Sequence, residues 1–230
     1  MRDEVFGAVA RRVPYLSVSD VTDGDDWVSC AALVANPAPT VRNTMVALGT
    51  ADVAVAASLF TEAYAFRVAG VALVAYALDL PVPDVAPRAV AVRTDKPRPP
   101  AVAYLAPELH DTNAPQLAHD LVGAHFEPFV AAIHDEFTVG ERLLWGNVAA
   151  ACAVAFLAIG DSARARANAE EFIRAAQPWF AETGSFKERL ARSEYQGWYW
   201  DRTSCCLWFQ TAEAGGQYCD NCTVRPDAER

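Results

Sequence analysis

The chain has 230 residues, of which 53% are hydrophobic and 21% are charged, and its formal net charge is −10 at pH 7. This composition excludes a disordered protein and allows a sizeable core, built as one large domain or as two closely packed lobes. The negative charge disfavours nucleic acid as a partner and also disfavours an anionic membrane surface, because both attract Lys and Arg.

The first part of the chain predicts a mixed lobe of helices and short strands. The N-terminal residues include acids and have no sustained apolar run, so they do not fit a secretory signal. Residues 27–35 are consistent with a strand. Apolar residues recur at helical spacing over 41–80, and residues 68–78 predict one fully buried helix.

A proline-rich stretch, residues 80–110, follows and is the expected boundary between two lobes. Within it, residues 89–94 and 101–105 predict two short strands, one of them at a sheet edge. We therefore expect a mixed α/β lobe over 1–110 and a helical lobe over 111–230.

Helices dominate the second lobe. Asn113 is expected to cap a helix with Pro115 in its first turn, and Pro128 to break or restart that helix. The next predicted helix spans residues 141–159. Their uncharged run, 143–159, reaches only the lower limit for a membrane span, so we interpret it as a buried bundle helix and expect no integral membrane protein.

The next helix is expected to begin at a cap formed by Asp161 or Ser162 and to end before Pro178. Its predicted buried face consists of Ala165, Ala169, Phe172, Ile173 and Ala176. A short polar helix is expected over Phe186–Ser193. The predicted fold class is α+β, mainly α, with a helical C-terminal lobe and a small N-terminal or central antiparallel β element.

The cysteine pattern near the C-terminus is the most informative motif. Four of the six cysteines follow the spacing Cys-Cys-x12-Cys-x2-Cys, as Cys205, Cys206, Cys219 and Cys222. We expect a cytoplasmic protein, and where thiols stay reduced such a cluster indicates metal or redox chemistry more often than disulfides. Four thiolates are the usual complement of a 2Fe–2S cluster, and two metals accept adjacent ligands more easily than one tetrahedral ion.

Two other interpretations of these cysteines stay open. A structural zinc site usually shows two Cys-x2–4-Cys knuckles, and only one is present. A thiol–disulfide pair at Cys219 and Cys222 has suitable spacing but lacks the strand-to-helix setting of redox motifs. Cys30 and Cys152 lie in apolar runs and are predicted to be core residues. No two of the four histidines have the i, i+4 spacing that would place two metal ligands on one helix face.

Two stretches carry a family resemblance. RTSCCLWF (202–209) followed by GGQYCDNC (215–222) resembles the C-terminal signature of the FhuF-type ferric-siderophore reductases. ERLLWGNVAAA (141–151) resembles a second recurring stretch of that family. The resemblance is most specific over residues 115–225, although the spacer between the cysteine pairs is longer here. The family is related to the C-terminal domain of the IucA/IucC-type siderophore synthetases.

The resemblance implies a concrete function. The 2Fe–2S cluster would be bound within segment 204–223 and would reduce siderophore-bound Fe(III) to Fe(II) by one electron, which releases the iron in the cytoplasm. The implied partners are a ferric siderophore and an electron donor such as a ferredoxin. The implied cluster ligands are Cys205, Cys206, Cys219 and Cys222.

Other residues near the cysteines have two interpretations each. Arg202 is a candidate catalytic residue that either meets an anionic siderophore or tunes the cluster potential; alternatively, it forms a surface salt bridge with Asp201 or Glu194. Trp208 is a second candidate. The tryptophans of this region either wall a cleft for a catecholate or pack as core around the cluster, and they are Trp198, Trp200 and Trp208.

The remaining candidates lie further from the cysteines in sequence. Trp145 is expected to be structural, and Asn147 either hydrogen-bonds the cluster loop or caps a helix. Three cations either complete a receptive patch or form a solvated helix face, namely Lys187, Arg189 and Arg192.

Three alternative functions remain. An iron–sulfur electron carrier or a siderophore-binding protein would share the cysteine site without enzymatic activity, and a zinc-stabilised interaction domain would use the cysteines structurally. A fragment of a siderophore synthetase fits less well, because no glycine-rich phosphate loop is visible.

Overall fold

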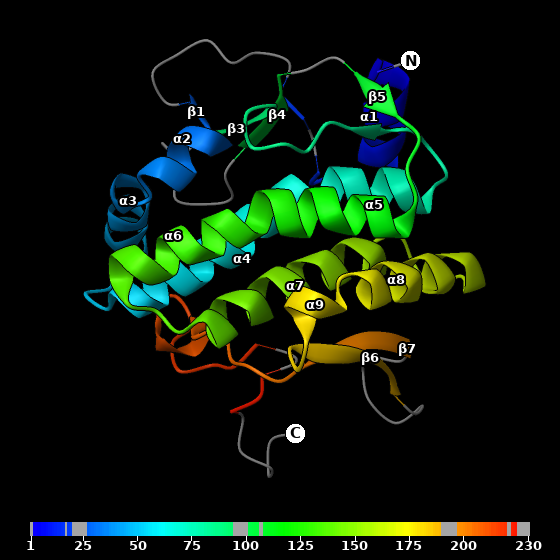
Figure 1. Cartoon of the computed structure of the whole chain (residues 1–230). Coiled ribbons are helices and arrows are strands. Elements are labelled where there is room, and N and C mark those ends of the chain that lie inside the picture. The colour runs from blue at the N-terminus through cyan, green and yellow to red at the C-terminus, as the bar shows by residue number, and fades with distance from the viewer. Residues whose placement is uncertain are drawn as a thin grey trace.

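The computed structural model describes residues 2–16, 18–19, 27–93, 101–105, 108–189, 197–219 and 222–224. Two long helices, α4 (Val53–Ala77) and α7 (Glu141–Leu157), pack against each other at its centre (Figure 1). Three small antiparallel sheets surround the helices. The predicted fold class, α+β and mainly α, is confirmed.

The N-terminal part places three helices and two small sheets on one side of α4. The helices are α1 (Arg2–Arg12), α2 (Cys30–Ala35) and α3 (Ala38–Leu48). The strands are β1 (Trp27–Ser29), β2 (Val82–Pro83), β3 (Val90–Arg93), β4 (Ala101–Tyr104) and β5 (Leu109–His110). Strands β1, β3 and β4 form one sheet in that order, and β2 pairs with β5. The two strands predicted within the proline-rich stretch are therefore confirmed as β3 and β4, with β4 at an edge.

One N-terminal prediction was wrong over most of its length. Residues 27–35 were expected to form a strand, but only Trp27–Ser29 is extended, and α2 begins at Cys30. The Ser29 hydroxyl accepts a hydrogen bond from the Ala32 N–H (3.2 Å), which caps the helix. The apolar run continues across this boundary and does not distinguish strand from helix.

The first helices of the second half form a nearly continuous rod. The rod consists of α5 (Ala114–Ala118), a π-helical stretch (His119–Phe126) and α6 (Glu127–Phe137). Asn113 caps α5 as predicted, because its side-chain oxygen accepts the Gln116 N–H at 2.9 Å. Pro128 lies in the first turn of α6, directly after the π-helical stretch, so the helical backbone continues past it.

The rest of the helical part is α7, α8 (Ala163–Ala175) and α9 (Gln177–Phe180). Helix α7 is a buried bundle helix, as predicted. Ser162, rather than Asp161, caps α8 by accepting the Ala165 N–H at 3.1 Å. The five residues predicted for the buried face of this helical segment are all buried.

The predicted polar helix over Phe186–Ser193 was also wrong. Residues Gly184–Arg189 form β6, which pairs antiparallel with β7 (Gly197–Arg202), whereas residues 190–196 lie outside the described part. Phe186 stacks on Trp198 with ring centroids 4.1 Å apart and meets Trp200 edge-on at 5.0 Å. These cross-strand aromatic contacts outweigh the local helix propensity of the segment.

One hydrophobic cluster extends from Val5 in α1 to Trp200 in β7 and includes both central helices. The division into lobes at residue 110 stays a prediction.

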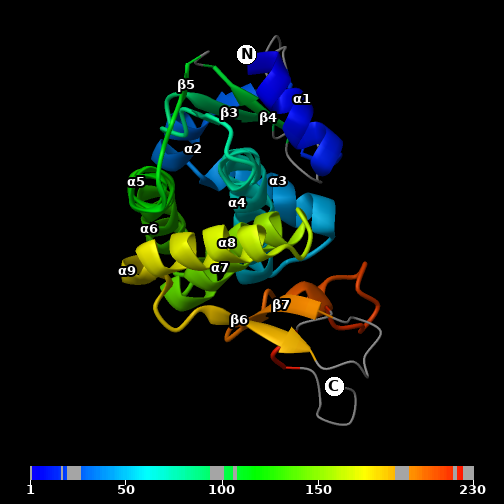
Figure 2. The same cartoon turned by 90° about the vertical axis from the view of Figure 1, so that its right-hand side faces the viewer.

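By length and composition α4 could cross a membrane, although 72% of its most apolar window is buried inside the protein. The β6–β7 hairpin and the cysteine segment lie across the helices from the three-stranded sheet (Figure 2).

A buried polar contact joins α4 to the π-helical stretch within this core. The Tyr64 hydroxyl lies 2.6 Å from His125 Nε2, and His125 Nδ1 lies 2.5 Å from the Val85 carbonyl oxygen. Burial lowers the pKa of His125 to about 4, although the backbone hydrogen bond opposes this shift. His125 is thus neutral in the folded protein at neutral pH.

Candidate metal centre

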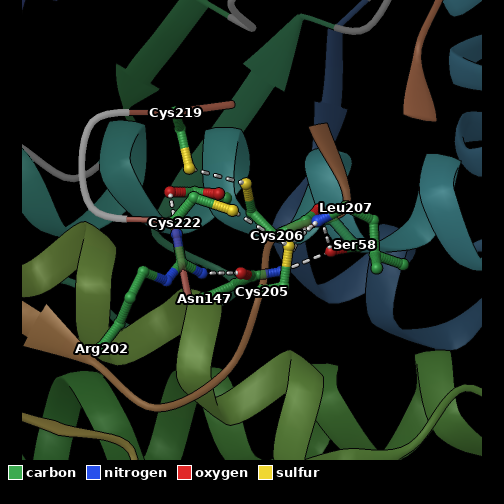
Figure 3. A network of polar contacts seen from close by, with 9 residues as sticks. Ser58, Asn147, Arg202, Cys205, Cys206, Leu207, Cys219 and Cys222 are labelled. Carbon is green, nitrogen blue, oxygen red and sulfur yellow. Dashed lines mark hydrogen bonds and ion pairs between the residues drawn. The ribbon is translucent and has the colours of Figure 1, made fainter. Parts of the chain in front are cut away.

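The four C-terminal cysteines lie together beside α4 and α7 (Figure 3). The Sγ atoms of Cys205 and Cys222 are 3.9 Å apart, and those of Cys206 and Cys219 are 3.8 Å apart. Cys206 and Cys222 are buried, whereas Cys205 and Cys219 are partly exposed. The fold thus brings the two cysteine pairs into one site close to the protein surface.

A tight backbone turn follows the adjacent cysteines. Leu207 adopts the left-handed conformation (φ 66°), which costs a non-glycine residue about 1–2 kcal/mol. Its N–H donates a hydrogen bond to the Cys205 Sγ at 3.3 Å. In the second pair, the Cys222 N–H donates to the Cys219 carbonyl at 3.1 Å. The hydrogen bond from Leu207 directs a backbone N–H at a sulfur, which stabilises a thiolate.

The segment that leads into the cysteines packs tightly on α7 at Gly146. A Cβ atom added at Gly146 would lie 1.9 Å from the Ser204 Oγ, so this position requires glycine for the close approach. Ser204 immediately precedes Cys205, and the contact therefore fixes the start of the cysteine segment against the central helix.

A chain of hydrogen bonds connects the cysteine segment to both central helices. The Ser58 hydroxyl of α4 donates to the Cys206 carbonyl at 2.7 Å. The Asn147 side chain of α7 donates to the Ser58 hydroxyl at 2.8 Å and to its carbonyl at 2.9 Å. Asn147 in turn accepts a hydrogen bond from the guanidinium of Arg202, which also pairs with Glu62 at 3.2 Å.

The thiols of Cys205, Cys206 and Cys219 lie close enough to shift one another's pKa values. Hydrogen bonds from Cys205 and Cys219, together with the positive charge of Arg202, lower the pKa of Cys206. The hydrogen bond with Cys206 is the main cause that raises the pKa of Cys205 and of Cys219. The neighbouring thiols and the buried cation Arg202 therefore stabilise a thiolate within this group of cysteines.

The other two cysteines do not take part in this site. Cys30 and Cys152 are fully buried in the core, as expected from their apolar surroundings in the sequence. Burial raises the pKa of Cys30 to about 12 and raises that of Cys152 as well. Neither thiol ionises near neutral pH.

The surface interpretation of Arg202 was wrong, because its side chain is only 2% exposed. Its predicted salt-bridge partner Asp201 pairs with Lys187 instead, and Glu194 lies outside the described residues. In an antiparallel strand successive side chains alternate between faces, so Asp201 and Arg202 point to opposite sides of β7. Burial also removes Arg202 from direct contact with a bulky ligand.

The neighbouring candidates divide between core and surface. Trp200 is buried in the core, Trp198 is partly buried against Phe186, and Trp208 is partly exposed in a short 3₁₀ turn (Trp208–Gln210). Trp145 packs edge-on against Phe180 with ring centroids 6.3 Å apart, which fits its structural role.

Lys187 is exposed, but it lies on strand β6 and not on a helix. The alternative of a solvated helix face was therefore wrong. The side chain of Arg189 and the whole of Arg192 lie outside the described residues.

Sequence reasoning missed Ser58 and Glu62. They lie on α4, more than 100 residues before the cysteines, and no motif links them to the C-terminal segment. The signal that the sequence offered was their polarity within a mostly apolar helix. Asn147 was expected either to hydrogen-bond the cluster loop or to cap a helix. It lies inside α7 and is connected to the Cys206 carbonyl through Ser58.

The residues of the site fit a thiolate-bound metal group. Thiolates are soft ligands that select zinc or iron–sulfur clusters. Two buried donors beside them, Arg202 Nε and Ser204 Oγ, have no hydrogen-bond partner within the described residues. Among the described residues, no three or more His, Cys, Asp or Glu side chains are arranged so that they could hold a single metal ion.

Comparison with known proteins identifies a family. The family described as ferric iron reductase FhuF-like transporter matches residues 58–196. The match includes the 141–151 stretch, begins earlier than the expected 115, and ends before the four cysteines. The relation to the IucA/IucC-type synthetases stays a prediction. A comparison with curated proteins finds no match. Because the family match covers more than half of the chain, the protein belongs to the ferric iron reductase FhuF-like family.

Proposed function

We propose that the protein is a ferric-siderophore reductase that uses a 2Fe–2S cluster bound by its four C-terminal cysteines. The observation that carries the proposal is the convergence of these thiols, with Sγ distances of 3.8 and 3.9 Å within the two close pairs, in a chain of the FhuF-like family. Four cysteine ligands are the usual complement of such a cluster. The proposed ligands are Cys205, Cys206, Cys219 and Cys222.

The chemistry of the substrate explains why a single electron is sufficient. Siderophore oxygens are hard, anionic ligands that hold Fe(III) more strongly than Fe(II), so one-electron reduction loosens the chelate. When bound, the cluster supplies a one-electron couple. No covalent bond of the siderophore has to break. We place this reaction in the cytoplasm, with a ferredoxin-type protein as the electron donor.

The protein's own residues prepare the site for such a group. The Leu207 N–H already donates to one sulfur, and the neighbouring thiols stabilise a thiolate at Cys206. The partial exposure of Cys205 and Cys219 keeps the centre near the surface, where a bulky chelate can approach without entering the core. Ser58 holds the Cys206 carbonyl and thus fixes the position of the adjacent pair.

The proposal is tested first by cofactor analysis of anaerobically purified protein. We expect about two irons and about two sulfides per chain, with visible absorption that Cys219→Ser abolishes. Cys152→Ser is the matched control, because Cys152 is buried away from the site and its substitution should leave the absorption intact. Protein with one zinc and no sulfide would instead identify a zinc-stabilised domain.

A second experiment separates a reductase from an electron carrier. Dithionite-reduced protein, freed of excess dithionite, is mixed with a ferric siderophore under anaerobic conditions. We expect the cluster to reoxidise while Fe(II) appears in equal amount, as measured with a ferrous chelator. A cluster that stays reduced in the presence of several ferric siderophores would contradict the reductase function and leave the carrier.

A further inference from the structure

A charged pair lies within the protein beside the cysteines. The side chain of Arg202 is 2% exposed and that of Glu62 is 31% exposed, and their charged atoms are 3.2 Å apart. Desolvating two charges costs several kcal/mol per ion unless hydrogen bonds compensate, so such a pair is weak support for stability alone. Its position next to a redox centre suggests a different use.

Both charges act on the same thiolate with opposite signs. The Arg202 side chain lies beside the cysteine sulfurs (Figure 3), so its positive charge favours negative charge there. For Glu62, burial is the main cause that raises its pKa, Arg202 lowers it, and negative charge on Cys206 raises it. Arg202 thus attracts negative charge at the sulfurs, and Glu62 repels it. Because the guanidinium is buried, salt screens these interactions only weakly.

Hydrogen bonds fix the guanidinium in place. Arg202 donates to the Asn147 side-chain oxygen, and the Asn147 amide group donates to both oxygens of Ser58 (Figure 3). Ser58 donates to the Cys206 carbonyl. The same network therefore holds both the cation and the backbone of one proposed ligand, which keeps their separation constant.

We propose that Arg202 and Glu62 set the reduction potential of the thiolate-bound centre, Arg202 raising it and Glu62 lowering it, with Asn147 and Ser58 as positioning residues. The physical reason is that one-electron reduction adds one negative charge to the centre, and a nearby cation stabilises that charge. This inference rests on the proposed function only in requiring that the centre be a redox cluster. It assigns Arg202 no contact with the siderophore.

The test compares midpoint potentials of anaerobically reconstituted protein in a redox titration followed by visible absorption. Arg202→Gln should lower the potential and Glu62→Gln should raise it. We expect the two variants to differ at least tenfold in the equilibrium constant for reduction, which is about 59 mV for a one-electron couple. Arg202→Lys keeps the charge and should stay closer to the wild type than Arg202→Gln.

The matched control is the exposed pair between Lys187 and Asp201 on the β6–β7 hairpin. Lys187→Gln and Asp201→Asn remove the same charges at the surface and should shift the potential much less, because water and salt screen them. Shifts of the Arg202 and Glu62 variants in the same direction, or no larger than those of the controls, would overturn the inference.

Two further outcomes are decisive. If Arg202→Gln fails to assemble the centre, Glu62→Gln alone decides: a raised potential supports the inference, and an unchanged one overturns it. Cluster content of the wild type is measured first, so that a wild type without iron and sulfide refutes the proposed function and this inference together. A loaded wild type whose variants do not shift refutes only the inference.

Discussion

Replacing Gly146 with alanine tests how closely the cysteine segment must lie on α7. The added Cβ would be 1.9 Å from the Ser204 Oγ and 3.1 Å from the Ser204 Cβ. Rotation of the hydroxyl can relieve the first contact. The second requires the backbone of Ser204 to move by a few tenths of an ångström, and this residue directly precedes Cys205.

The expected energy follows from two opposing effects. Gly→Ala within a helix normally stabilises by about 1 kcal/mol, whereas overpacking of a well-packed site costs about 1–3 kcal/mol. The free energy of unfolding should therefore fall by up to about 2 kcal/mol, as measured by urea denaturation of the reduced, metal-free protein. Iron and sulfide content after reconstitution should also fall, because the first ligand pair is displaced.

Gly7→Ala in α1 is the matched control for this substitution. Its nearest neighbour is a terminal nitrogen of the flexible Arg11 side chain at 3.3 Å, which can move away. This variant should gain up to about 1 kcal/mol and bind a normal amount of iron. Adding Ser204→Ala to the Gly146 variant should restore part of the lost stability. Equal stabilisation by both glycine substitutions would refute the close packing of Ser204 on α7.

Two further predictions concern buried polar side chains. Asn147→Ala removes one hydrogen bond to a charged group and two neutral hydrogen bonds. The free energy of unfolding, measured by urea denaturation, should therefore fall by about 2–4 kcal/mol. The control Asn43→Ala, on the exposed surface of α3, should change it by less than about 0.5 kcal/mol. The pKa of His125 is about 4 in the folded state, against 6.5 for the unconstrained side chain. As the pH falls, the unfolded chain therefore binds the proton before the folded protein does. The free energy of unfolding should decrease between about pH 6.5 and pH 4, by about 2 kcal/mol at pH 5. His125→Gln should remove this part of the pH dependence, and an unchanged slope between pH 7 and 5 would contradict the assignment.

Local sequence patterns determined the elements whose stabilising contacts are themselves local. Asn113 and Ser162 cap their helices by accepting hydrogen bonds from N–H groups three residues ahead. Residue type and position therefore predicted the Asn113 cap and limited the other cap to Asp161 or Ser162. The uncharged run of α7 likewise identified a buried helix, and the apolar spacing of α8 identified its buried face. The cysteine pattern indicated a thiolate site, because its residue types and spacing are themselves the chemistry.

Tertiary structure decided what depends on partners distant in sequence. Residues Phe186–Arg189 form a strand because β7 pairs with them and its tryptophans pack against Phe186. Arg202 can be buried because Glu62, 140 residues away, and Asn147 on another helix accept hydrogen bonds from its two terminal nitrogens. A buried charge is tolerable only when such partners surround it, and packing of the whole chain, rather than any short stretch of it, brings them there.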